Sequence, residues 1–456
     1  MEKRKSILIL TPDGTGIKNY LYSGVFRDAN ASLCLFHNFD QDTLDTIRHE
    51  VAIDQDLVIP NYSEGVKEKF LRELIHAARI IYNARSQNNP TIHAFRKKNH
   101  KSFKLKIFHA VINARLAFVS SYKTILKLES RYDRAIRKNP FYTEVSELLK
   151  THRPDRLFCT HQRALTAPTI FAAARDLGIP TTTVIYSWDN LPKARLALRA
   201  DSYLVWSDHM KKEMATFYPE IDQSQVKVTG TPQFEFYADS NNIIPRDQFY
   251  SQFQLDPNKK LICFSGDDVK TSPYDPEYLN DLAEGLTRAG LDDRYQVVFR
   301  RCPVDLSGRY DRVLNNYPEL IKEAPPLWNF NSKVWTAVYP LVADIQLLVS
   351  MAYYCDVVMN VGSTMAFDFG MFQKPCIFIN YDHKQDPDWS VTTIYNYQHF
   401  RSMPSEKAVY WLNDKNEIEQ LVQQAIESPE TEIRDWFQVV VEHQNEASQR
   451  ILKELL

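Results

Sequence analysis

The chain of 456 residues lacks the features that mark membrane-spanning, metal-binding and nucleic-acid-binding proteins. It has no run of about 18 apolar residues, so no membrane-spanning helix is expected, and the apolar stretch at 7–10 is too short for a signal sequence. The six cysteines include no CxxC pair, which argues against zinc and redox motifs and favours buried, reduced thiols. The formal net charge of −2 provides no positive field to attract a nucleic acid. We therefore expect an ordinary globular, cytoplasmic protein.

Short apolar runs alternate with longer helical stretches along most of the chain. The runs are rich in β-branched and aromatic residues and nearly continuous in their apolarity, which is typical of strands buried on both faces of a parallel sheet. They lie at 6–11, 32–37, 155–160, 181–186, 202–206, 226–229, 260–264, 295–299, 356–361 and 376–380. A polar, turn-rich stretch near 240–256 divides them into two sets. The pattern predicts two α/β domains.

Residues 62–150 break this alternation, because they contain no convincing strand and are typical of helices. Within 96–138 there are 13 lysines and arginines against two acidic residues. Apolar residues recur there at helical spacing: Phe103, Ile107, Ala110, Val111 and Ala114. We predict an amphipathic helix with a basic face. Such a face is either solvated or in contact with an anionic membrane or a charged acceptor.

Ligands of open α/β sheets bind beyond the carboxyl ends of the strands, so the residues that follow each strand are candidates for a site. Asp13, His161 and Asp189 each follow a strand of the first set and are candidate general bases. The loops around them supply further candidates to line the site: Gly14, Gly16, Asn19, Trp188, Asn190, Gly230 and Pro232. The turn at Gly230 and Pro232 is either a hinge or a ligand loop.

The second set of strands is followed by small residues and arginines. Ser265 and Gly266 follow one strand, and small residues there allow a phosphate to approach closely. Arg300 and Arg301 follow the next strand. Two arginines suit a diphosphate because each guanidinium donates two parallel hydrogen bonds, although they could equally pair with nearby carboxylates.

The most informative stretch, 360–370, links a strand to a helix that begins near Ser363 or Thr364. Gly362, Ser363 and Thr364 would let the free N–H groups at the start of this helix hold a phosphate. Asp368 lies one turn further along the helix on the same side as Thr364, where a carboxylate suits a ribose diol.

The stretch DVVMNVGSTMAFDFGMFQKPCIFIN, residues 356–380, resembles the donor-site helix of GT-B glycosyltransferases. It is most similar to the bacterial surface-polysaccharide group, which is related to the CDP-glycerol glycerophosphotransferases. The stretches SWDN, YLVWSDHMKKEM, YPEI and VKVTGTPQFEFY also resemble the end of the N-terminal domain in such enzymes. The resemblance covers roughly 155–382 and leaves out 62–150.

The resemblance implies a GT-B fold, in which two Rossmann-like domains with parallel sheets face each other across a cleft. The N-terminal acceptor domain would span 1–245 and carry the helical, basic insertion. The C-terminal domain, 246–430, would bind the nucleotide donor, and a helix within 431–456 would return to the N-terminal domain.

The resemblance further implies a metal-independent glycosyltransferase without a cofactor. It would move a sugar from a nucleotide-sugar donor to a hydroxyl of a cell-surface glycan or lipid-linked acceptor, at the inner face of the plasma membrane. Gly362, Ser363 and Thr364 would hold the diphosphate and Asp368 the ribose. The choice of base and the stereochemical outcome stay open. The alternatives are a CDP-polyol phosphotransferase, a sugar-nucleotide 2-epimerase and a non-catalytic scaffold of the same fold.

Overall fold

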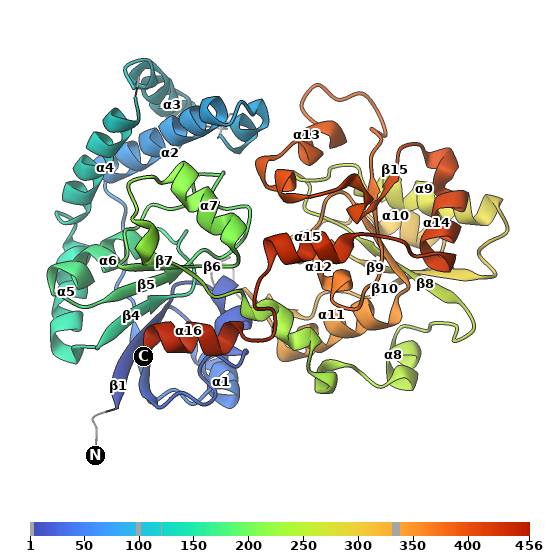
Figure 1. Ribbon diagram of the computed structural model, residues 1–456, viewed down its shortest axis with the longest axis horizontal. Helices are drawn as coiled ribbons and strands as arrows, with labels where there is room; N and C mark the ends of the chain where they lie inside the picture. The colour runs from blue at the N-terminus through green and yellow to red at the C-terminus, as the bar shows by residue number, and fades with distance from the viewer. Residues whose placement is uncertain (1–3, 97–101, 120, 331–337) are drawn as a thin grey trace. The chain divides into compact units, whose positions relative to one another are not determined.

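The computed structural model describes residues 4–96, 102–119, 121–330 and 338–456, and it divides the chain into two units (Figure 1). Unit 1 comprises Met1–Pro232, Phe330–Tyr339 and Val440–Leu456. Unit 2 comprises Gln233–Asn329 and Pro340–Val439. The change from unit 1 to unit 2 therefore follows Pro232, before the predicted boundary at 245.

Unit 1 is built on a seven-stranded parallel sheet in the order β3-β2-β1-β4-β5-β6-β7. Its strands are β1 (Lys5–Thr11), β2 (Ala31–His37), β3 (Gln55–Val58), β4 (Arg156–Cys159), β5 (Thr181–Val184), β6 (Ser202–Val205) and β7 (Val226–Val228). Its helices are η1 (Ile17–Leu21), α1 (Gln41–Glu50), α2 (Val66–Ser86), η2 (Pro90–Phe95), α3 (Phe103–Leu116), α4 (Tyr122–Ile136), α5 (Pro140–His152), α6 (Ala167–Asp176), α7 (Asp208–Phe217), η3 (Gln223–Gln225) and α16 (Ala447–Leu455). The central strand β1 is buried from Ile7 onward, which explains its unbroken apolar sequence.

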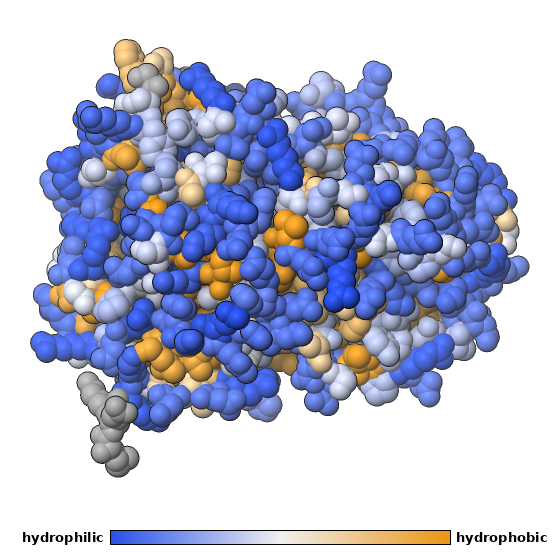
Figure 2. Space-filling model, viewed as in Figure 1, coloured by the Kyte–Doolittle hydropathy of each residue, from blue (hydrophilic) through white to orange (hydrophobic). Residues whose placement is uncertain are grey.

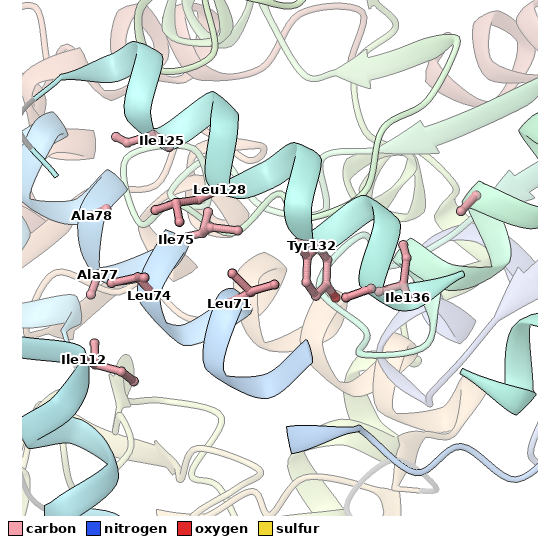
Figure 3. Close-up of a cluster of buried hydrophobic side chains, with 12 residues drawn as sticks. Leu71, Leu74, Ile75, Ala77, Ala78, Ile112, Ile125, Leu128, Tyr132 and Ile136 are labelled. Atoms are coloured by element: carbon pink, nitrogen blue, oxygen red, sulfur yellow. The ribbon is translucent and has the colours of Figure 1, made fainter. Parts of the chain in front are cut away.

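The predicted helical insertion is confirmed, since α2 to α5 lie between β3 and β4. Figure 3 shows how α2 and α4 pack on each other through apolar side chains, among them Leu71, Leu74, Leu128 and Tyr132. The basic side of α4 is exposed and its apolar side is buried, so α4 is amphipathic. The apolar residues on which the amphipathic helix was predicted lie on α3 instead, and there they are exposed. The predicted basic residues Lys97, Lys98 and Lys101 lie outside the described residues.

Helix α3 differs from its neighbours because most of its apolar side chains are exposed. Ile112 is its one buried residue. Phe103 is 75% exposed, Ile107 51% and Val111 47%. Figure 2 shows hydrophobic side chains gathered at the upper left, where Figure 1 places α3.

Unit 2 is built on a six-stranded parallel sheet in the order β10-β9-β8-β13-β14-β15. The strands of this part of the chain are β8 (Lys260–Ser265), β9 (Tyr295–Arg300), β10 (Ile321–Glu323), β11 (Trp328–Asn329), β12 (Tyr339–Pro340), β13 (Val357–Asn360), β14 (Cys376–Ile379) and β15 (Tyr410–Leu412). The helices are η4 (Pro232–Tyr237), η5 (Ser240–Asn242), α8 (Arg246–Gln252), α9 (Asp275–Arg288), α10 (Asp311–Asn316), α11 (Val342–Tyr354), α12 (Met365–Gly370), α13 (Val391–Tyr395), η7 (Gln398–Ser402), η8 (Glu406–Ala408), η9 (Lys415–Glu417), α14 (Ile418–Glu427) and α15 (Ile433–Val440).

Both sheets have the strand arrangement of a Rossmann-like domain. In each, the first strand lies in the middle, the next two extend to one side and the later strands extend to the other. The prediction of two parallel-sheet α/β domains is therefore confirmed. Within the described part of the chain, no helix is both long and apolar enough to span a bilayer.

Candidate functional site

The first candidate site lies in unit 1, where the carboxyl ends of β1 and β4 are adjacent. The strand order reverses between these two strands, and ligands of open α/β sheets bind at such a point. Asp13 follows β1 and His161 follows β4, and Nδ1 of His161 lies 2.7 Å from Oδ2 of Asp13. The structure thus brings together two of the three candidate bases.

Of the two nitrogens of the His161 imidazole, one contacts the Asp13 carboxylate and the other has no hydrogen-bond partner among the described residues. Oδ1 of Asp13 accepts a hydrogen bond from the N–H of Thr15 at 3.1 Å, which orients the carboxylate. Nε2 of His161 is buried and has no hydrogen-bond partner among the described residues. When Nδ1 carries the proton and donates it to Asp13, Nε2 carries the lone pair. This is the arrangement that a general base needs.

Asp189, the third candidate base, follows the neighbouring strand β5 and has partners of its own. It forms an ion pair with Lys193 and accepts a hydrogen bond from Asn190 at 2.6 Å. Asn190 in turn accepts a hydrogen bond from Nε2 of Gln162 at 2.9 Å. Gln162 therefore ties this loop to the one that carries His161, a role with no signal in the sequence. Trp188 is 3% exposed, so its ring is part of the core.

The glycines of the first loop allow other residues of unit 1 to pack closely against this loop. A Cβ atom on Gly16 would lie 2.2 Å from Oγ1 of Thr160, and one on Gly14 would lie 2.2 Å from the carbonyl oxygen of Val338. The helix expected after this loop is the five-residue η1, in which Asn19 is 2% exposed. Direct contact of these residues with a ligand stays a prediction.

The turn at Gly230 packs against the C-terminal segment of unit 1. Gly230 has a φ of 77°, and a Cβ atom there would lie 2.4 Å from the carbonyl oxygen of Glu442. Both observations require a glycine. Pro232 is the last residue of this stretch of unit 1. The choice between a hinge and a ligand loop stays open.

The second candidate site lies in unit 2, where the strand order reverses between β8 and β13. After β13, Gly362 adopts a φ of 66° and packs against Phe400, which a Cβ atom would approach to 2.9 Å. The side chain of Asn360 accepts a hydrogen bond from the N–H of Ser363 at 2.8 Å and so holds the turn. Thr364 is exposed and is the N-cap residue of α12, where the sequence predicts the helix to begin.

The two arginines at the end of β9, of which Arg300 is the last strand residue, pair with carboxylates. Arg300 is 5% exposed, and its Nη2 lies 2.9 and 3.0 Å from the two oxygens of Asp344. Asp344 also accepts a hydrogen bond from Nε1 of Trp328 at 2.9 Å. Nε of Arg301 donates to Glu323 at 2.5 Å. Both arginines thus pair with nearby carboxylates, which was the alternative to binding a diphosphate. Contact of either arginine with a diphosphate stays a prediction.

Asp368, the predicted ribose ligand, is joined to a buried tyrosine. The O–H of Tyr237 donates to Oδ1 of Asp368 at 2.5 Å. Burial and the negative charge of Asp368 raise the pKa of Tyr237, so this hydroxyl remains a hydrogen-bond donor. A contact of Asp368 with ribose stays a prediction.

The loop after β8 is braced by a cluster that the sequence did not reveal. Ser265 is 5% exposed, and a Cβ atom on Gly266 would lie 2.5 Å from the hydroxyl of Tyr310. That hydroxyl accepts a hydrogen bond from Nη2 of Arg309 at 2.8 Å. Burial raises the pKa of the neighbouring Asp275 to about 7. Because a Cβ atom on Gly266 would collide with Tyr310, a glycine is needed here for internal packing.

Comparison with protein families identifies one match within unit 1. The model of the monogalactosyldiacylglycerol (MGDG) synthase family matches residues 68–232. This match covers less than half of the chain, and it includes α2 to α5, which the motif resemblance leaves out. Comparison with curated proteins found no match.

Solved structures resemble the chain over nearly its whole length. A glycosyltransferase from Rickettsia africae has a TM-score of 0.52 at 9% identity, over 99% of this chain and 97% of that one. UDP-GlcNAc 2-epimerase from Methanocaldococcus jannaschii has a TM-score of 0.52 at 10% identity, over 99% of both chains. MnaA of S. aureus, solved with UDP, has a TM-score of 0.51 at 12% identity, over 99% of this chain and 96% of that one. The chain therefore has the fold shared by GT-B glycosyltransferases and sugar-nucleotide 2-epimerases.

Proposed function

We propose that the chain is a glycosyltransferase that moves a sugar from a nucleotide-activated donor to a hydroxyl of a lipid-linked acceptor. The observation that carries this proposal is the Asp13–His161 pair, at 2.7 Å, where the strand order of unit 1 reverses. The similarity of residues 68–232 to MGDG synthase, whose name describes the glycosylation of a lipid, favours a lipid acceptor over a soluble one.

In the proposed reaction, His161 accepts the proton of the acceptor hydroxyl at Nε2. Asp13 holds Nδ1–H and stabilises the imidazolium that forms. Direct attack by the activated oxygen inverts the configuration at the sugar carbon, and the bond to the nucleoside diphosphate breaks. The turn Gly362–Thr364 in unit 2 is the proposed binding place of the departing diphosphate, whose growing negative charge needs fixed N–H donors.

Helix α3 is the proposed contact with the membrane that holds the acceptor. Phe103, Ile107 and Val111 recur every four residues and are exposed, and Lys104 and Lys106 lie among them. Apolar side chains enter the boundary between headgroups and acyl chains, while lysines attract anionic lipids.

The test measures sugar transfer from UDP-, GDP- and CDP-linked donors to diacylglycerol and to extracted membrane lipids. We expect His161→Asn to lower kcat by about 10²- to 10⁴-fold, the usual contribution of a general base, without weakening nucleotide binding. Asp13→Asn should also lower kcat, because the imidazole loses its orienting partner. The matched control is His152→Asn, at an exposed histidine in the last turn of α5.

Three outcomes would contradict the proposal. Full activity of His161→Asn would remove the proposed base. Conversion of the nucleotide-sugar with no acceptor present would instead identify a 2-epimerase. Absence of binding to every nucleotide would favour a scaffold.

A further inference from the structure

Unit 1 contains a cavity of about 150 Å³ beside the loop that carries His161. It is lined by α2, α4 and α6, by the loop after β4 from Gln162 to Leu165, and by the segment Ala194–Arg199. Pockets that enclose a whole small-molecule ligand measure roughly 300–1,000 Å³. A smaller cavity suits one group of a larger ligand.

The charge of the lining is positive, since six arginines stand against three carboxylates. Four of the arginines have carboxylate partners within ion-pair distance: Arg72, Arg79, Arg175 and Arg199. Arg163 and Arg195 differ from these four. Within the described part of the chain, neither side chain has a hydrogen bond or an ion pair.

The Arg195 side chain is partly buried, and its Nε atom is buried without a partner among the described residues. A buried donor without an acceptor is costly, so native structures rarely keep one without a reason. Burial and the nearby charge of Arg163 lower the pKa of Arg195. An anion placed between the two guanidinium groups would supply acceptors to both and offset their repulsion.

The backbone fixes Arg195 in this position. Ala194 adopts a φ of 53°, which is uncommon for a residue with a Cβ atom. The N–H of Arg195 donates to the carbonyl oxygen of Asn190 at 3.2 Å, and the side chain of Asn190 is held by Gln162. The segment with Arg195 is thus anchored to the residue next to His161.

Apolar side chains form another part of the lining. Ile75 from α2, Ile136 from α4, and Pro168 and Ala172 from α6 line the cavity. Leu165 also lines it and is 48% exposed. Apolar walls next to unpaired guanidinium groups suit an amphiphile with an anionic group more than a free inorganic ion.

We propose that Arg163 and Arg195 bind a phosphate group of the acceptor, which is therefore an anionic lipid or a phosphorylated lipid-linked glycan. The assignment of the bound molecule as the acceptor rests on the proposed function. The phosphate site itself rests on the cavity alone. Arg163 lies two residues after His161 in the loop that follows β4, and the proposal therefore assigns the bound phosphate to the molecule whose hydroxyl His161 would deprotonate.

The experiment measures binding by calorimetry, with the donor site saturated by whichever of UDP, GDP and CDP stabilises the protein most. The two probes are dioctanoyl phosphatidic acid, below its micelle concentration, and glycerol 3-phosphate. Arg163→Gln and Arg195→Gln should each weaken phosphatidic acid binding at least tenfold. Arg195→Lys should weaken it less, because the charge remains while the paired N–H donors are lost.

The matched control is Arg134→Gln, an exposed arginine on α4 whose side chain does not line the cavity. It removes the same charge from the same unit and should change the affinity less than twofold. Tighter binding of phosphatidic acid than of glycerol 3-phosphate is expected from the apolar lining. Equal binding of the two would support a water-soluble phosphate as the source of the group.

Two results would overturn the inference: unchanged affinity in both glutamine variants, or no saturable binding of either probe to folded wild-type protein. Its failure is distinguishable from failure of the proposed function. Nucleotide binding and lipid glycosylation without arginine-dependent phosphate binding would remove the phosphate site and leave the transferase. Arginine-dependent phosphate binding in a protein that binds no nucleotide would support the phosphate site and contradict the transferase.

Discussion

At the scale of single residues, the candidate catalytic pair illustrates what a sequence can and cannot reveal. Asp13 and His161 were candidates because each follows a buried strand. Their contact joins residues 148 positions apart, and no local pattern distinguishes it from the equally attractive Asp189. The pairing of Arg300 with Asp344 could not be predicted from the sequence either. Asp344 lies 44 residues further along the chain, in the first turn of α11, and no local pattern there indicates Arg300 as its partner.

Gly362 provides a residue-scale prediction for the proposed diphosphate turn. Gly362 and Gly290 both have a φ of 66°, but a Cβ atom on Gly290 would meet nothing within 4 Å. Gly290→Ala should therefore cost only the backbone strain, about 1–2 kcal/mol. Gly362→Ala adds a clash with Phe400 and should cost roughly 1–3 kcal/mol more. Urea-induced unfolding measures both costs.

The same pair of variants tests the function of the turn. Gly362→Ala should weaken nucleotide binding because it displaces the backbone N–H groups of the turn, whereas Gly290→Ala should leave that binding unchanged. Equal nucleotide affinity in the two variants, measured where both are folded, would place the nucleotide elsewhere.

At the scale of elements, the strands that sequence analysis found and missed differ in their place in the sheet. All ten predicted runs correspond to observed strands. In the two large parallel sheets, the three strands without a prediction are β3, β10 and β15, and each lies at an edge. The short strands β11 and β12, which pair with each other, were not predicted either. Edge strands are short and covered on fewer sides, so they need no continuous apolar sequence. In β3, for example, Gln55 and Val58 are exposed.

Helix α3 gives the element-scale prediction. The triple variant Phe103→Ser, Ile107→Ser and Val111→Ser should bind phosphatidylcholine vesicles with 30% phosphatidylglycerol several-fold less than wild type. Its melting temperature should hardly change, because Phe103, Ile107 and Val111 are 75%, 51% and 47% exposed. Co-sedimentation measures the bound fraction, and added salt should lower wild-type binding through the lysines.

A matched control removes the same number of exposed apolar side chains outside α3: Val66, Val269 and Leu306, which are 83%, 50% and 71% exposed. Their replacement by serine should leave vesicle binding as it is in wild type. Similar losses in the two triple variants would mean that α3 is not a specific membrane contact.

At the scale of the whole molecule, the alternation of strands and helices was sufficient to predict two Rossmann-like sheets. The family resemblance implied that a C-terminal helix returns to the N-terminal domain, and α16 belongs to unit 1. In this segment the N–H of Glu442 donates to the carbonyl oxygen of Trp206 at 3.0 Å. The assignment of Phe330–Tyr339 to unit 1 had no signal in the sequence, because it depends on contacts between distant residues.

This division leads to a prediction about how the units lose their structure. Ile451 on α16 is 1% exposed and belongs to unit 1, whereas Gln449 on the same helix is exposed. Ile451→Asp places an unpaired charge in an apolar environment and should destabilise unit 1 by about 4 kcal/mol or more. Gln449→Asp adds the same charge in water and should cost less than about 0.5 kcal/mol.

Because the proposed nucleotide turn lies in unit 2, Ile451→Asp should abolish sugar transfer and phosphatidic acid binding at a temperature where nucleotide binding persists. Melting curves recorded with and without a saturating nucleotide separate the two events. Nucleotide at 100 times its Kd stabilises the unit that binds it by about 2.7 kcal/mol and should shift only the later transition of the variant. A single transition in which transfer and nucleotide binding disappear together would show that the two units unfold as one.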